Sequence, residues 1–130
     1  MLSMPKVTRR FFVVSAIGVF FIGLPRPCRA DKAEASIEGP REVSKGEEVV
    51  LKVTFSHSSN TPSHYVEWAY VRVNGKEVAR WDFTPEKLPE SARFTREVRV
   101  KIEGDTEITA QGSCNKHGSK GQTTLRIRAK

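Results

Sequence analysis

The stretch that most clearly indicates the fold of this 130-residue chain is Tyr65-Val66-Glu67-Trp68-Ala69-Tyr70-Val71-Arg72-Val73-Asn74-Gly75. Residues 65–73 are mostly aromatic or β-branched, and such side chains favour strands. The Asn-Gly pair that follows is a strong hairpin signal, because both residues tolerate a positive φ angle. We therefore expect a strand over residues 65–73, a two-residue turn and a return strand over residues 76–83.

Alternating apolar and polar residues on both sides of this hairpin predict further strands. Residues 49–55 and 94–102 alternate with period two, which indicates one buried face in each. Shorter strands are expected at residues 34–38, 107–110 and 123–129, whereas residues 84–90 contain two prolines and are predicted to form a crossing loop. About seven short strands, with no helical period after residue 30, predict an all-β, immunoglobulin-like antiparallel β-sandwich.

The first thirty residues differ from the rest of the chain. They hold five basic residues and no acidic one, around an apolar block at residues 11–24 that precedes Cys28-Arg29-Ala30. This pattern is typical of an export signal peptide, and Arg9-Arg10 indicates the twin-arginine route to the periplasm or another extracytoplasmic space. The apolar block is shorter than the roughly 20 residues of a membrane span, so we expect no stable membrane insertion after signal cleavage. An uncleaved N-terminal anchor is the alternative. The predicted domains are a signal peptide at residues 1–30 and one β-sandwich at residues 31–130.

Removal of this signal would change both the charge and the cysteine content. The formal net charge of +7 would fall to +2, because 17 basic residues would remain against 15 acidic ones. That balance argues against a nucleic-acid partner, which requires a strongly basic face. Cys28 lies in the signal, so Cys114 would be a single thiol in an oxidising compartment, which favours metal ligation or chemistry at that thiol. A Cys28–Cys114 disulfide is the alternative if the signal is retained.

The histidines of the chain lie near Cys114 or in one other predicted loop. His57 and His64 bracket a six-residue loop, and Cys114 and His117 bracket the turn Asn115-Lys116. All four residues follow or precede predicted strands, and loops at one end of a sandwich can converge. Imidazole suits iron, zinc and copper, and a cation promotes the thiolate that binds it. We therefore predict a transition-metal site at these four residues; the alternative is that the histidines belong to ordinary surface loops.

The motif Cys114-Asn115-Lys116-His117-Gly118, together with His64-Tyr65-Val66-Glu67-Trp68, resembles the desulfoferrodoxin or superoxide reductase family. The resemblance covers most of residues 31–130. It implies a mononuclear non-haem iron (Fe²⁺/Fe³⁺) with equatorial histidines and an axial thiolate. It also implies reduction of superoxide to hydrogen peroxide with electrons from an external donor, which the sequence does not identify. Cys114 is similar to the axial thiolate, and His64 and His117 to equatorial ligands. Lys32 resembles the family's lysine at the open face, where a cation attracts superoxide; an ordinary solvated lysine is the alternative.

The chain also departs from the family pattern. Ala33 stands where a histidine follows that lysine, the loop between His57 and His64 is one residue longer than usual, and Ser119-Lys120 replaces an apolar pair. The first hypothesis is an exported superoxide reductase-like oxidoreductase. The second is a family member that binds iron, zinc or copper without superoxide chemistry. The third is a non-catalytic carrier or partner domain similar to the immunoglobulin-like subunit of the thiosulfate-oxidation complex. A homo-oligomer is compatible with all three.

Overall fold

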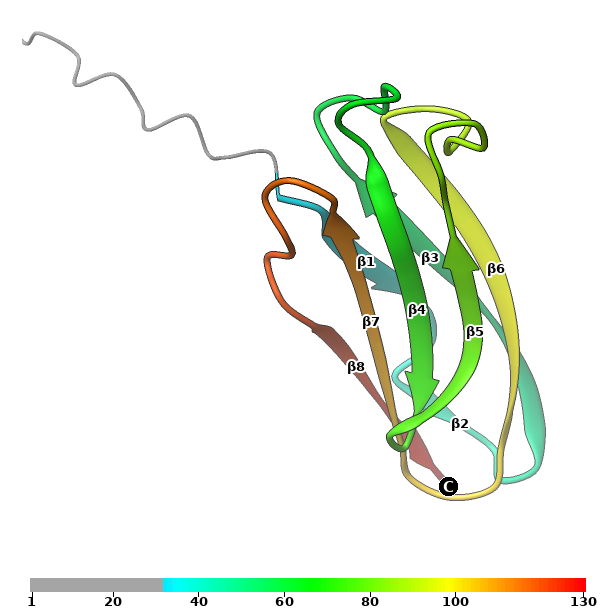
Figure 1. The fold of residues 1–130 in the computed structure, drawn as a ribbon. Coiled ribbons are helices and arrows are strands. Elements are labelled where there is room, and N and C mark those ends of the chain that lie inside the picture. The colour runs from blue at the N-terminus through cyan, green and yellow to red at the C-terminus, as the bar shows by residue number, and fades with distance from the viewer. Residues whose placement is uncertain (1–31) are drawn as a thin grey trace, which may run out of the picture.

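The computed structural model describes residues 32–130, which form eight strands and no helix (Figure 1). The strands are β1 (Glu34–Glu38), β2 (Glu42–Val43), β3 (Glu47–Ser56), β4 (Val66–Val73), β5 (Lys76–Asp82), β6 (Arg93–Ile102), β7 (Thr106–Cys114) and β8 (Thr123–Ala129). The predicted signal peptide, with its paired arginines and Cys28, lies outside the described residues, as does residue 31, the first of the predicted β-sandwich domain. Between residues 32 and 130 no helix has the length and apolar character needed to cross a membrane.

The strands form two stacked sheets, which confirms the predicted all-β sandwich. One sheet has the strand order β1-β3-β6, and the other has the order β2-β8-β7-β4-β5. Neighbouring strands are antiparallel except for β2 and β8, which pair in parallel through two residues each. The sequence pattern did not predict β2, because two residues are too short to show a period. Backbone bonds hold it in place, from Arg128 N to Arg41 O (2.8 Å) and from Lys130 N to Val43 O (2.9 Å).

The predicted hairpin joins β4 to β5. Its turn residues Asn74 and Gly75 have φ angles of 50° and 83°, as a turn of this kind requires. Asn74 also contacts the neighbouring strand β7, because its Oδ1 accepts a hydrogen bond from Glu107 N (2.9 Å) and its N donates to Glu107 O (2.8 Å). The turn is therefore tied to a second strand of the same sheet.

The core lies between the two sheets, and burial alternates along β3 and β6 as the sequence predicted. Phe55 of β3 is fully buried, and its ring lies 5.9 Å from that of Trp81 and 5.4 Å from that of Phe94, measured between centroids. Strand β7 is longer than the predicted residues 107–110, since pairing with β4 continues through Gly112 and Ser113 to Cys114. This extension places Cys114 at the last position of an inner strand.

Three chain segments reach the same end of the sandwich, at the top of Figure 1. Strand β3 ends there at Ser56, strand β4 begins there at Val66, and strand β7 ends there at Cys114. The loops that follow or precede these strands carry the three histidines of the predicted site, and its cysteine is the last residue of β7.

Candidate metal centre

His57, His64 and Cys114 lie together at this end of the sandwich. The ligand atoms that they offer all lie within 4.8 Å of one another. His57 follows β3 directly, His64 precedes β4 by two positions, and Cys114 ends β7, so both sheets contribute. His57 is 8% exposed and Cys114 is 2% exposed. The imidazole rings of His57 and His64 have centroids 4.6 Å apart and meet edge to face.

His117, the fourth predicted ligand, lies beside this cluster but outside it. Its ring centroid is 5.0 Å from that of His64, and the two rings are nearly perpendicular, at 87°. The residue is exposed, in contrast to His57 and Cys114. The structure therefore brings three of the four predicted ligands into one group and places the fourth at its rim.

A short loop holds the cysteine and His117. Cys114 N donates to Gly118 O (2.8 Å) and Gly118 N donates to Cys114 O (3.0 Å), so the chain folds back on itself within five residues. Gly118 has a φ of 75°, which favours glycine at this position. Inside the loop, Lys116 N donates to Cys114 Sγ at 3.4 Å. A backbone donor aimed at sulfur stabilises negative charge on it, as a metal-bound thiolate requires.

The loop between His57 and His64 is closed by its own polar groups. Thr61 N donates to His64 O (2.9 Å) and His64 N donates to Thr61 O (3.1 Å), around Pro62-Ser63. Asn60 Oδ1 accepts a hydrogen bond from Val66 N at 2.9 Å. The extra residue of this loop, which made the assignment of His57 less direct in the sequence, does not prevent His57 from reaching the cluster.

The segment before β6 supports the loop from the other side. His57 N donates to Ala92 O (2.8 Å), and Asn60 Nδ2 donates to Ser91 O (2.7 Å). Arg96 forms an ion pair with Glu90 at the start of this segment, and the hydrogen bonds from its guanidinium hold the pKa of Glu90 below its usual range. The first half of the histidine loop is thus bound to the segment that precedes β6.

Ala33 lies against the cysteine loop, but its methyl side chain has no atom that could bind a metal ion. Its N donates to Gly118 O (3.2 Å), and its O accepts from Lys120 N (3.0 Å). Its side chain is fully buried, and a Cβ added to Gly112 would lie 3.6 Å from the Ala33 methyl group. Ala33, which stands where the family pattern has a histidine, therefore lies next to the cysteine loop, and its side chain packs in the core. Lys32, the residue before it, is exposed.

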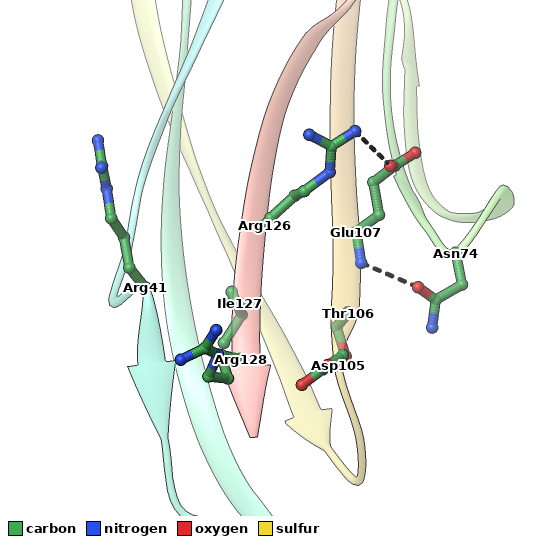
Figure 2. A pocket seen from close by; sticks show the side chains of 8 residues that line it. All are labelled: Arg41, Asn74, Asp105, Thr106, Glu107, Arg126, Ile127 and Arg128. Atoms are coloured by element: carbon green, nitrogen blue, oxygen red, sulfur yellow. Dashed lines mark hydrogen bonds and ion pairs between the residues drawn. The ribbon is translucent and has the colours of Figure 1, made fainter. Parts of the chain in front are cut away.

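A separate pocket of about 410 Å³ lies at the opposite end of the sandwich (Figure 2). It is lined by Arg41, Asn74, Asp105, Thr106, Glu107, Arg126, Ile127 and Arg128. Within it Arg126 pairs with Glu107 at 3.4 Å, so part of its charge is neutralised internally. It contains no histidine or cysteine. The candidate metal site is therefore identified by its imidazole and thiol groups and not by the size of a pocket.

The three converging side chains fit a transition-metal ion. Bonds of about 2.0–2.3 Å to imidazole nitrogen and thiolate sulfur place donors roughly 3.5 Å apart around one ion. The donors of His57, His64 and Cys114 already lie within 4.8 Å, and two of these residues are shielded from solvent. The sequence did not indicate the role of Asn115, whose amide joins the cysteine loop to the residues that flank His64; its only signal was the tendency of asparagine to bond nearby backbone.

Comparisons with known proteins agree with this fold. The desulfoferrodoxin family model matches residues 29–120. The superoxide reductase (neelaredoxin) of Ignicoccus hospitalis is similar in structure, with a TM-score of 0.55 and 22% identity over 78% of this chain and 84% of that one. A putative superoxide reductase of Thermotoga maritima has a TM-score of 0.56 and 23% identity over 75% of this chain and 86% of that one.

A CARDB domain of Pyrococcus furiosus, solved in complex with di-metal ions, shares the fold as well. Its TM-score is 0.58, with 15% identity over 76% of this chain and 94% of that one. At these identities the three structures show a common sandwich. No curated protein sequence matches the chain. The family model covers more than half of the chain and includes the Cys114–Gly118 motif, which confirms the resemblance seen in the sequence. The chain therefore belongs to the desulfoferrodoxin family.

Proposed function

We propose that this protein is an exported superoxide reductase-like oxidoreductase that uses a mononuclear iron held by His57, His64 and Cys114. The observation that carries the proposal is the convergence of these three donors within 4.8 Å in a desulfoferrodoxin-family sandwich. Two proteins of similar structure are named superoxide reductases, which supports superoxide as the substrate. Export to the periplasm rests on residues 1–30, and N-terminal sequencing of protein from that compartment would check it.

The residues of this chain would divide the work between holding the ion and receiving the substrate. Iron, when bound, supplies the one-electron Fe²⁺/Fe³⁺ couple, and an external donor restores the reduced form. The buried Cys114, whose Sγ accepts a hydrogen bond from Lys116 N, would supply the anionic ligand. His117, 5.0 Å from His64 between ring centroids, would add a further imidazole. The overall reaction joins one superoxide, one electron and two protons to give one hydrogen peroxide.

The stoichiometry of peroxide formation tests this proposal. Iron-loaded protein, supplied with a reductant and a steady source of superoxide, is expected to give one hydrogen peroxide for each superoxide consumed. Dismutation would give one peroxide for every two superoxide ions and would contradict the proposal. The metal-free protein under the same conditions is the control, since it should only follow the spontaneous reaction.

Replacement of Lys32 with glutamate is expected to slow superoxide consumption roughly 3- to 10-fold at low ionic strength, because steering of an anion depends on nearby positive charge. The difference should shrink in high salt, where screening acts over about 3 Å at 1 M. Lys76→Glu, at the exposed start of β5 and at the far end of the sandwich, makes the same charge change and is the control. Equal effects of the two substitutions would show that only net charge matters.

A second candidate is metal binding without superoxide chemistry. It is favoured by the donor count, since the cluster among residues 32–130 holds two histidines and one cysteine, and Ala33 adds none. Few-coordinate nitrogen and sulfur sites suit zinc and copper. Stoichiometric zinc in the purified protein, with no peroxide formed after iron loading, would support this candidate over the first.

A further inference from the structure

Asn115 lies between the two loops that carry the candidate ligands. Its side-chain Oδ1 accepts a hydrogen bond from Tyr65 N (3.0 Å), and its Nδ2 donates to Ser63 O (3.2 Å). Its backbone N donates to Tyr65 O (3.0 Å). Ser63 and Tyr65 flank His64, so one asparagine next to Cys114 binds the residues on both sides of His64.

The strand pairing alone leaves this junction irregular. The ladder between β4 and β7 changes register between Val66 and Trp68, at its last step before Cys114. A bulge of this kind interrupts the regular hydrogen bonds that would otherwise fix the spacing of two strands. Beyond the bulge, the bonds of Asn115 connect the cysteine loop to the His64 segment.

We propose that Asn115 is a positioning residue that sets the separation between Cys114 Sγ and the His64 imidazole, and through it the affinity and geometry of the metal centre. This inference rests on the proposed metal site. Groups that orient ligands from outside the coordination sphere commonly change metal affinity 10- to 100-fold when they are removed. Asn115 is suited to this role because it holds His64 from the residue adjacent to the thiolate.

Asn60 provides a matched control. Its Oδ1 accepts from Val66 N (2.9 Å) and its Nδ2 donates to Ser91 O (2.7 Å), so it makes the same two kinds of bond. It supports the same histidine loop, but it ties that loop to the segment before β6 rather than to the cysteine loop. A general loss of loop stability should therefore appear in both variants, whereas loss of ligand spacing should appear only at Asn115.

The test is titration of the metal-free full chain with Co²⁺ in competition with a chelator, with the visible spectrum recorded at each step. Asn115→Ala is expected to bind Co²⁺ roughly 10- to 100-fold more weakly than the unchanged protein. Its ligand-field bands and sulfur-to-cobalt charge-transfer band should change in position and intensity, a change that a purely structural role would not produce. Asn60→Ala should bind within about threefold of the unchanged protein and keep its spectrum.

The variant Asn115→Asp distinguishes the effect of ligand positioning from the effect of charge on Co²⁺ binding. It also replaces Asn115→Ala in the test if the alanine variant does not fold. The carboxylate can still accept from Tyr65 N, and it adds negative charge near Sγ, which lies 3.8 Å from Oδ1 of Asn115. It cannot donate to Ser63 O. Attraction of the cation by this charge predicts tighter Co²⁺ binding, whereas the positioning role predicts weaker binding and an altered spectrum.

The outcomes distinguish this inference from the proposed function. Absence of Co²⁺ binding by the unchanged protein would overturn both. Strong binding that Asn115→Ala leaves unchanged, or that Asn60→Ala weakens equally, would overturn the positioning role and leave the metal centre standing. Tighter binding by Asn115→Asp would overturn it as well.

Discussion

Replacement of Cys114 with serine is expected to abolish the sulfur-to-metal charge-transfer absorption of the iron- or cobalt-loaded protein, and to weaken metal binding by roughly 100-fold or more. Cys114 supplies the sulfur and the anionic donor of the cluster found among residues 32–130. A serine hydroxyl of similar size remains protonated near neutral pH, so the ion would keep only neutral imidazole ligands. The measurement is absorbance during metal titration, together with metal analysis after gel filtration.

The matched control is Cys28→Ser in the full-length chain, which makes the same chemical change in the predicted signal peptide. It should leave the charge-transfer band and the metal affinity unchanged. A band that survives in Cys114→Ser, or that disappears in Cys28→Ser, would show that Cys114 is not the sulfur ligand. Both variants therefore decide whether the buried thiol of β7 binds the ion.

Replacement of Phe55 with alanine is expected to lower the free energy of unfolding by about 3–5 kcal/mol. The side chain is fully buried between the sheets and packs against the rings of Trp81 and Phe94. It also fills the space beside Gly112, where an added Cβ would lie 3.2 Å from the Phe55 ring. The smaller side chain would leave a cavity between the two sheets. Urea unfolding followed by tryptophan fluorescence measures the loss.

Val50→Ala is the control for this prediction. Val50 lies on the same strand but is 45% exposed, so its truncation should change the free energy of unfolding by no more than about 0.5 kcal/mol. A loss in Phe55→Ala as small as that of the control would mean that the two sheets close over the missing ring. Burial of the Phe55 ring would then contribute little to the stability of the sandwich.

Much of the fold could be predicted from local sequence, because period-two alternation and the turn at Asn74-Gly75 are local signals. The elements that could not be predicted lack such signals. Strand β2 has two residues, and the last part of β7 runs through Gly112 and Ser113, neither of which favours strands. Their pairing depends on partners elsewhere in the chain.

The residues of the candidate site and the convergence of their loops were predicted from the sequence, but the position of each side chain was not. Cys114 and His64 were indicated by the motif and by loop position, and the structure brings them together with His57. The placement of His117 at the rim depends on how a five-residue loop turns, which spacing alone does not determine. The bonds of Asn115 join segments about fifty positions apart, so only the folded chain reveals them.

The supply of ligands from both sheets has a consequence for how the two layers stay together. His57 follows a strand of the three-stranded sheet, while His64 and Cys114 adjoin strands of the five-stranded sheet. An ion bound to all three would be a cross-link between the two layers, as the inter-sheet disulfide of antibody domains is. At a thousandfold excess over its dissociation constant, such a ligand would add about 4 kcal/mol to the stability of the folded state. Metal supply would then determine the stability of the sandwich as well as the occupancy of the proposed site.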